Sequence, residues 1–445
     1  MKNETPKKGV ATGFVIPEAF LHSIWRFKLF KTEALCSSSG EKIQMLHGGT
    51  QNLSAGPDFF NAKIKIGNQL WVGNVEMHVK SSDWYAHKHE KDPNYDNVIL
   101  HVVWEYDVPI FRKNNEEIST LILQNFVLSE TLENFKELFR KKQRWILCEK
   151  DISSISSFYM RAWLTRLYTE RLERKTKEIA VLLSATKNDW EAVLFVLLAK
   201  NFGTVLNGGA FLNMARSFDF SVLRKLQKKE SGIETLLMGQ AGFFEQNVED
   251  AHFIACRKEY QYLQKKFCLQ PVFNKQFQFF RTRPSNFPTL RISQLSELYQ
   301  GHPHLFSEVL QRAGLEEFYD LFQTSASEYW DTHYVFGSPS KKRRKKISKS
   351  FVDLLVVNTV VPLKFAYGFF QKSSSFEGLE ILIQSVKPES NSIIEHFKKL
   401  GVEVFSALES QSLLELKNHY CDPKKCLECS IGIQLLKETS GNIEV

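Results

Sequence analysis

The N-terminal third of the chain contains the run Ala55-Gly56-Pro57-Asp58-Phe59-Phe60, followed by Gly73-Asn74-Val75-Glu76-Met77-His78-Val79-Lys80. In the second run, three apolar residues alternate with the ionisable residues Glu76, His78 and Lys80. Because successive side chains of a strand point to opposite faces, this alternation predicts a β-strand with its ionisable side chains on one face. Phe59 to Ile66 also has the pattern of a strand, and Gly67-Asn68 predicts a reversal between the two.

Asp58 and Glu76 are therefore expected on adjacent strands, where two carboxylates can share a metal ion. Hard divalent cations such as Mg²⁺ or Mn²⁺ prefer oxygen ligands and keep positions open for water and a substrate phosphate. In this interpretation His78 or Lys80 orients or deprotonates the water, or stabilises developing charge. Glu18, on a predicted helix before the sheet, could add a third carboxylate. The alternative is a turn at Gly56-Pro57-Asp58 and a merely solvated sheet face.

A second group of ligand-type side chains follows in the polar segment Ser81 to Tyr95. His87, His89 and Asp92 form an H-x-H-x-x-D pattern close to Asp83 and Tyr95. Imidazole and carboxylate together suit zinc, iron or nickel, or a role in proton transfer. The pattern is equally typical of a polar loop with surface histidines. His101 lies in an apolar strand, where a lone histidine is more often a hydrogen-bonded core residue than a ligand.

The C-terminal cysteines Cys421, Cys426 and Cys429 have the spacing C-x4-C-x2-C. Seven cysteines in a chain without a recognisable export signal argue against a disulfide framework. Three closely spaced thiolates favour zinc or an iron–sulfur cluster, with a fourth ligand from His419, Cys148 or elsewhere. Free reduced thiols are the alternative.

The fold class predicted from these patterns is α+β. Residues 1–150 are expected to form a mixed α/β sheet domain, residues 151–335 a helical domain, and residues 336–445 a C-terminal helical region with the cysteines. A helix is predicted over 18–30, and strands over 42–46, 58–66, 69–80, 97–105 and 119–123. Further helices are predicted over 159–183, 190–199, 209–217, 221–227, 249–267 and 292–299.

A net charge of +8 permits a polyanionic partner such as DNA or RNA without requiring one. Six consecutive basic residues, Lys341 to Lys346, predict a solvated loop that could contact phosphates. The apolar run from Phe351 to Phe370 is interrupted by Asp353, Asn358, Pro362 and Lys364, which argues against a membrane span. We expect a soluble, cytoplasmic protein with no membrane partner, and the sequence leaves its oligomeric state open.

Several motifs together resemble an uncharacterised bacterial family that is known only as a domain of unknown function. They are Phe20-Leu21-His22-Ser23-Ile24-Trp25, Ala55 to Phe59, Asn74 to His78 with Ser82-Asp83-Trp84, His87 to Tyr95, Asn97 to Val103, Gly239-Gln240-Ala241-Gly242 and Arg283 to Pro288. The resemblance extends over nearly the whole chain, including the C-terminal cysteines. It implies a family and no activity.

The first 130 or so residues also resemble the core of the PD-(D/E)xK nucleases. There an acidic residue after proline and an E-x-K triplet on the next strand bind metal, which matches Pro57-Asp58 and Glu76-Met77-His78 with histidine at the lysine position. Lys80 lies one strand repeat farther along. Some relatives of that superfamily carry a cysteine-bound iron–sulfur cluster near the chain end, which the resemblance extends to Cys421, Cys426 and Cys429.

Three functions are compatible with these features. The first is a divalent-metal-dependent nuclease with Asp58, Glu76 and His78 or Lys80 at its centre. The second is a non-catalytic nucleic-acid-binding or scaffold protein with the same core. The third is a metallohydrolase of small substrates built on His87, His89 and Asp92.

Overall fold

The computed structural model describes residues 15–140, 144–272, 276–373 and 376–437. The chain forms two compact units. The N-terminal unit comprises the described parts of residues 1–163, 399–402 and 416–445, and the helical unit comprises those of residues 164–398 and 403–415. The predicted α+β class is confirmed, because a mixed sheet precedes a mostly helical remainder. The expected C-terminal region, 336–445, is divided between the two units.

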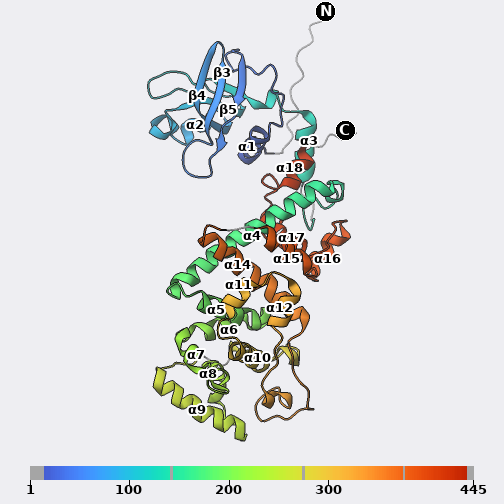
Figure 1. Ribbon diagram of the computed structural model, residues 1–445. Coiled ribbons are helices and arrows are strands. Elements are labelled where there is room, and N and C mark those ends of the chain that lie inside the picture. Colours follow the sequence, from blue (N-terminus) through green and yellow to red (C-terminus); the bar gives the residue numbers. More distant parts are fainter. Residues whose placement is uncertain (1–14, 141–143, 273–275, 374–375, 438–445) are drawn as a thin grey trace, which may run out of the picture. The chain divides into compact units, whose positions relative to one another are not determined.

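A six-stranded sheet organises the N-terminal unit (Figure 1). Its strands are β1 (Ile43–His47), β2 (Thr50–Gln51), β3 (Phe59–Ile66), β4 (Gln69–Lys80), β5 (Val98–Glu105) and β6 (Thr120–Ile122). The order is β1-β3-β4-β5-β6, with β2 also paired to β3. β1, β3 and β4 run antiparallel, whereas β4, β5 and β6 run parallel. The five strands predicted from the sequence are confirmed to within about one residue at each end, well inside the usual boundary error.

In the described part of this unit, four whole α-helices accompany the sheet: α1 (Glu18–Phe27), α2 (Asp83–Ala86), α3 (Ser129–Phe139) and α18 (Ser430–Lys437). Short 3₁₀ turns occur at His89–Lys91, Pro93–Tyr95, Leu123–Asn125 and Ile152–Ser154. α1 packs against β4, so that Phe20, Leu21 and Ile24 share one core with residues of the sheet. Ile433 and Leu436 of α18 belong to the same core. This packing holds the polar residues of α1 at one edge of β4.

The helical unit is built from fourteen α-helices within the described residues. They are α4 (Ser157–Ala185), α5 (Trp190–Phe202), α6 (Thr204–Arg216), α7 (Phe220–Leu226), α8 (Gly232–Gln240), α9 (Ala251–Phe267), α10 (Pro288–Gly301), α11 (Leu305–Gln311), α12 (Leu315–Leu321), α13 (Lys349–Leu355), α14 (Val361–Phe370), α15 (Glu377–Ser385), α16 (Ser392–Lys399) and α17 (Ala407–Leu416). Short 3₁₀ turns lie at Phe243–Glu245, Pro284–Asn286 and Glu328–Asp331, and a π-helical turn at Val356–Val360. A second π-helical turn, Lys417–Cys421, follows α17 and belongs to the N-terminal unit.

The continuous helical segment Lys349–Phe370 is long and apolar enough to cross a membrane, yet 67% of its most apolar window is buried inside the protein. Val356, Val360 and Leu363 of this segment belong to the core of the helical unit. This is the environment of a core helix, as the interrupting polar residues predicted.

The basic run Lys341–Lys346 is only partly a solvated loop. Five of its six residues are exposed, but Lys345 is buried. Its ammonium group donates hydrogen bonds to the carbonyl oxygens of Trp330 and His333 and lies 4.0 Å from the ring centroid of Tyr334. The prediction of a fully solvated run was therefore wrong at Lys345, because three acceptors around one ammonium replace its water.

Candidate metal site

α1 presents two polar side chains to the end of β4. Glu18 and His22 are one helical turn apart and therefore lie on the same face. The opposite, apolar face of α1 is anchored in the core. Both polar side chains are partly exposed, with 21% of the His22 side chain accessible.

Asp58, directly before β3, completes a first group with these two residues. Glu18, His22 and Asp58 each offer one ligand atom, and these atoms all lie within 4.8 Å of one another. We call these three residues the α1 group. Nε2 of His22 lies 3.2 Å from Oδ2 of Asp58, at ion-pair distance. The three ligand atoms are therefore close enough together to be shared by one ion.

Glu76 of β4 lies between the α1 group and a second group of side chains. Its Oε2 accepts a hydrogen bond from the backbone N–H of Asp58 (3.1 Å), and Oδ2 of Asp58 accepts one from the N–H of Met77 (2.9 Å). The two acids on adjacent strands therefore converge, as the sequence predicted. Oε1 of Glu76 lies 3.3 Å from Nε2 of His89 and 3.6 Å from Nε2 of His78.

The second group, which we call the histidine group, consists of His78, His87 and His89. Their ligand atoms also lie within 4.8 Å of one another. Lys88, between two of them, has a left-handed backbone (φ 62°), which turns the chain so that both neighbouring imidazoles approach β4. The ring of His89 stacks on Tyr95 at a centroid distance of 3.7 Å and meets the edge of Trp84. Nε2 of His89 has no aligned hydrogen-bond partner among the described residues.

His101 of β5 supports the histidine group from the core. It is fully buried, and its Nε2 lies 2.8 Å from Nδ1 of His78, whose Nε2 lies 3.0 Å from Nδ1 of His87. The expectation of a hydrogen-bonded core histidine at this position is confirmed. Burial lowers the pKa of His78 to about 2 and that of His101 to about 3. Both imidazoles are therefore neutral at physiological pH, which is the protonation state that binds metal.

Two acids of the site, Glu76 and Glu18, have raised pKa values. Burial raises the pKa of both, and the charge of Asp58 raises both further. Burial lowers the pKa of His22, but the neighbouring carboxylates of Asp58, Glu18 and Glu76 together raise it by more. Carboxylates crowded into a poorly hydrated site repel one another, and a divalent cation would relieve that repulsion.

The structure does not bring every candidate residue to this centre. Lys80 is about half exposed, and its ammonium group lies 3.9 Å from Glu105. Asp92 accepts hydrogen bonds from the backbone and side chain of Asn94, and so caps the turn Pro93–Tyr95. The alternative of a solvated sheet face was wrong for Glu76 and His78, which are 5% and 1% exposed, because the segment after β4 covers them.

His22 and His101 join the site without having been proposed as ligands. The spacing Glu18-x₃-His22 on a predicted helix was the available signal for His22, since residues four apart share a helix face. For His101 the signal was weaker. The parallel pairing that places it opposite Glu76 depends on a contact distant in sequence.

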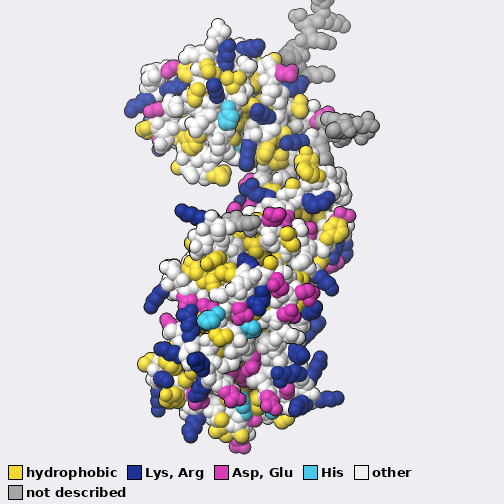
Figure 2. Space-filling model, viewed as in Figure 1, with side chains coloured by type: hydrophobic (Ala, Val, Ile, Leu, Met, Phe, Trp, Pro, Cys, Tyr) yellow, Lys and Arg dark blue, Asp and Glu magenta, His cyan; other side chains and the backbone are white. Residues whose placement is uncertain are grey.

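The site reaches the protein surface. His87 and Lys88 are exposed, and the side chain of Lys91 is 76% exposed. Figure 2 shows histidine at the surface of the N-terminal unit, with lysine and arginine side chains around it. A negatively charged substrate could therefore approach the ligand atoms from solvent.

The C-terminal cysteines lie in the same unit, at a separate place. Cys421, Cys426 and Cys429 line a small cavity together with Cys148. The sequence suggested Cys148 or His419 as a fourth ligand. Cys148 lines this cavity, and His419 is not among the described residues that line it.

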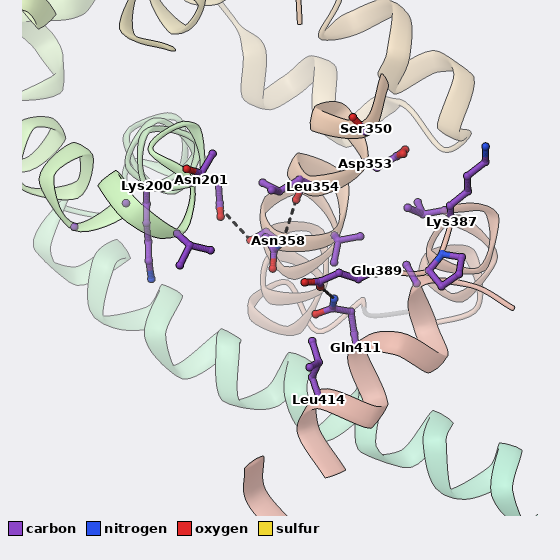
Figure 3. Close-up of a pocket in the computed structure, with 18 residues that line it drawn as sticks. Lys200, Asn201, Ser350, Asp353, Leu354, Asn358, Lys387, Glu389, Gln411 and Leu414 are labelled. Carbon is purple, nitrogen blue, oxygen red and sulfur yellow. Dashed lines mark hydrogen bonds between the residues drawn. The ribbon is translucent and has the colours of Figure 1, made fainter. Parts of the chain in front are cut away.

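The helical unit contains a larger cavity of about 710 Å³ (Figure 3). Its walls carry Lys200, Asn201, Asn358 and Gln411 beside apolar side chains, and no described histidine or cysteine. Its two carboxylates already have partners, since Glu389 accepts a hydrogen bond from Gln411 (2.8 Å) and Asp353 accepts one from Tyr319 (2.6 Å). This cavity therefore lacks the ligand set found in the N-terminal unit.

The sequence model of one protein family, described as protein of unknown function (DUF2851), matches residues 18–392. The chain belongs to this family. The match includes every residue of the α1 group and the histidine group. It ends before Cys421, so the family model does not cover the C-terminal cysteines, although the resemblance was expected to include them. No curated protein and no solved structure matches the chain.

Proposed function

We propose that this DUF2851 protein is a divalent-metal-dependent hydrolase of phosphodiesters in nucleic acid. The observation that carries the proposal is the position of Glu76, whose two carboxylate oxygens face the α1 group on one side and the histidine group on the other. A carboxylate in that position can bridge two ions. Pairs of metal ions about 3.5–4 Å apart are a recurring device for phosphodiester hydrolysis.

The ligand types favour particular ions. Carboxylates with one imidazole, as in the α1 group, suit Mn²⁺ and tolerate Mg²⁺, whereas three imidazoles with a carboxylate suit Mn²⁺, zinc or iron better than Mg²⁺. Mn²⁺ is the ion that both groups accept, so it is the first choice for assays.

The ions would polarise the phosphate and lower the pKa of a bound water. The chain's own residues would hold and orient them. His22, beside Asp58, would be the imidazole ligand of the α1 group, with Glu18 and Asp58 as its carboxylates. His101 and Tyr95 would act as positioning residues for His78 and His89, by the hydrogen bond and the ring stacking described above.

The surroundings support a polyanionic substrate. The net charge is +8, and exposed lysines adjoin the histidine group. These features favour DNA or RNA in the cytoplasm over a neutral small molecule. Lys80, at the end of β4, lies beside Glu105 instead of the ligand atoms, so it is not part of the proposed site.

The test is cleavage of single- and double-stranded DNA and RNA by the purified chain with Mn²⁺, Mg²⁺ or Zn²⁺. We expect Mn²⁺-dependent cleavage that falls by about 10²-fold or more in Asp58→Asn and Glu76→Gln, the loss typical of a residue that stabilises the transition state. Lys80→Gln is the matched control and should retain most of the activity.

Two other outcomes identify the other functions. Binding of nucleic acid without cleavage in any metal would indicate a non-catalytic binding protein. Hydrolysis of bis(p-nitrophenyl) phosphate alone, lost in His87→Ala and His89→Ala and retained in Asp58→Asn, would indicate a small-substrate metallohydrolase centred on the histidine group.

A further inference from the structure

Four cysteines from distant parts of the sequence meet in the N-terminal unit. Cys148, Cys421, Cys426 and Cys429 line a small enclosed cavity, closed on its other sides mainly by apolar residues such as Ile146, Ile152 and Ile431, with Tyr420 also present. The free space between the atoms is about 10 Å³, so a metal centre there must bond directly to the sulfurs in place of van der Waals contact.

The backbone around Cys429 is arranged to stabilise a thiolate. The N–H groups of Ile431 and Gly432, at the start of α18, donate hydrogen bonds to its sulfur. Gly432 also lets the backbone of Cys426 lie against the start of α18, since a Cβ at this position would lie 2.1 Å from the carbonyl oxygen of Cys426. N–H groups directed at sulfur are a common feature of metal-bound cysteines, because they stabilise negative charge on the ligand.

Buried cysteines are frequently inert apolar residues, and this is the alternative here. It accounts poorly for four thiols that face one another in a single cavity. A metal centre accounts for this arrangement, because it binds cysteines as thiolates and displaces their protons.

We infer that Cys148, Cys421, Cys426 and Cys429 together bind an iron–sulfur cluster. A single tetrahedral zinc with Zn–S bonds of about 2.3 Å would hold its sulfurs only about 3.8 Å apart. Among the described residues, the sulfurs do not form a group whose ligand atoms all lie within 4.8 Å of one another, whereas the histidine group does. The wider arrangement, with a cavity between the sulfurs, suits a polynuclear cluster whose irons each take a thiolate.

The cluster would join two segments that are far apart in the sequence. Cys148 follows the sheet, in the segment before α4, and the other three ligands precede α18. Cluster binding would therefore fix the C-terminal segment to the N-terminal unit, and the energy of metal binding would add to the stability of that unit. Four thiols lose their protons to solvent when the cluster is bound, and no change of oxidation state is required of the cysteines.

The experiment is elemental analysis of the full-length chain, purified without oxygen, together with acid-labile sulfide and an absorption spectrum. We expect iron and sulfide in equal amounts and a broad band near ~400 nm. Cys148→Ser and Cys426→Ser should lose the acid-labile sulfide, the band near ~400 nm and the iron that accompanies them. Cys36→Ser is the matched control, since Cys36 is an exposed cysteine of the same unit, and it should keep the wild-type iron content.

One zinc per chain without iron, or wild-type protein without bound metal, would overturn the inference. So would full iron content in Cys148→Ser. Loss of the cluster could unfold a variant, so circular dichroism is recorded in parallel, and where a variant is unfolded the wild-type iron and sulfide content decides. The result is independent of the proposed hydrolase, whose Glu76→Gln variant should lose cleavage and keep its iron.

Discussion

At the scale of single residues, Glu76 is the most constrained side chain of the candidate site. It is 5% exposed, with His89 beside one oxygen and the backbone of Asp58 hydrogen-bonded to the other. A buried carboxylate with no firm cationic partner lowers stability, since the charged form loses its hydration. In the proposed account, a divalent cation bound nearby would offset this cost.

The burial of Glu76 predicts how Glu76→Gln changes the free energy of unfolding. In excess EDTA the variant should be at least as stable as wild type, because the glutamine amide keeps the shape of the side chain and removes its buried charge. With saturating Mn²⁺ the order should reverse, since only wild type gains binding energy. Urea unfolding in the two conditions measures both values. Equal responses of the two proteins to Mn²⁺ would contradict the assignment of Glu76 as a ligand.

Gly432 permits a second prediction at this scale. Gly432→Ala places a methyl group against the carbonyl oxygen of Cys426, and we expect a loss of about 1–3 kcal/mol in the free energy of unfolding. Gly209→Ala is the control. It lies in α6 with nothing within 4 Å of the added methyl group, and it should raise stability by up to about 1 kcal/mol. Chemical denaturation of both variants tests the contrast, and a neutral Gly432→Ala would refute it.

At the scale of elements, the sequence predicted the strands of the N-terminal unit well because each has a local signal. Alternating residues defined β4, and Gly67, with φ 58°, makes the turn before it. The covering of Glu76 and His78 had no such signal. It depends on how the segment from α2 to Tyr95 folds back over β4, and therefore on the packing of Trp84 and Tyr95 around His89. The convergence of Asp58 with Glu76 was predictable, whereas the roles of Lys80 and Asp92 were not.

The loop that carries the histidine group depends on the left-handed backbone of Lys88. A β-branched residue is strained in this conformation, whereas glycine adopts it freely. Lys88→Val should therefore weaken binding of Mn²⁺ to the histidine group, and Lys88→Gly, which removes the same charge, should retain most of it. Calorimetric titration of the two variants compares them directly. Equal affinities would show that the loop conformation does not control the site.

Glu191, in the first turn of α5, predicts a pH dependence of stability. Burial raises its pKa from 4.5 to about 7, although the N–H of Phe306 donates to its carboxylate. Between pH 4.5 and about 7 this carboxyl group is ionised in the unfolded chain and protonated in the folded chain, so the free energy of unfolding falls as pH rises. Below pH 4.5 the group is protonated in both states, and it makes no pH-dependent contribution to stability.

The corresponding variant is Glu191→Gln, which keeps an acceptor for Phe306 and cannot ionise. Relative to wild type it should gain stability as pH rises from about 4.5 to 7 and show no further gain above that range. Thermal unfolding at several pH values follows the difference in Tm. A difference that is independent of pH would contradict the raised pKa.

At the scale of the whole molecule, each unit has its own hydrophobic core. Six helices of the helical unit, α4, α5, α6, α7, α9 and α10, were predicted from their apolar residues, whereas α8 and α11 to α17 were not given bounds. The division of the last hundred residues between the two units was not predicted either. Ile433 and Leu436 enter the core of the N-terminal unit, and Cys429 meets Cys148, through contacts that no local pattern encodes. The burial of Lys345 could not be predicted from local sequence for the same reason, since it depends on carbonyl groups that precede it by more than ten residues.

The central claim is that the α1 group and the histidine group bind divalent cations with Glu76 between them. The most direct test is the stoichiometry of Mn²⁺ binding to the metal-free protein, measured by equilibrium dialysis with electron paramagnetic resonance. We predict two strongly bound ions in wild type and in Lys80→Gln, with weakened or lost binding in Glu76→Gln. No bound Mn²⁺ in wild type, or unchanged binding in Glu76→Gln, would contradict the claim.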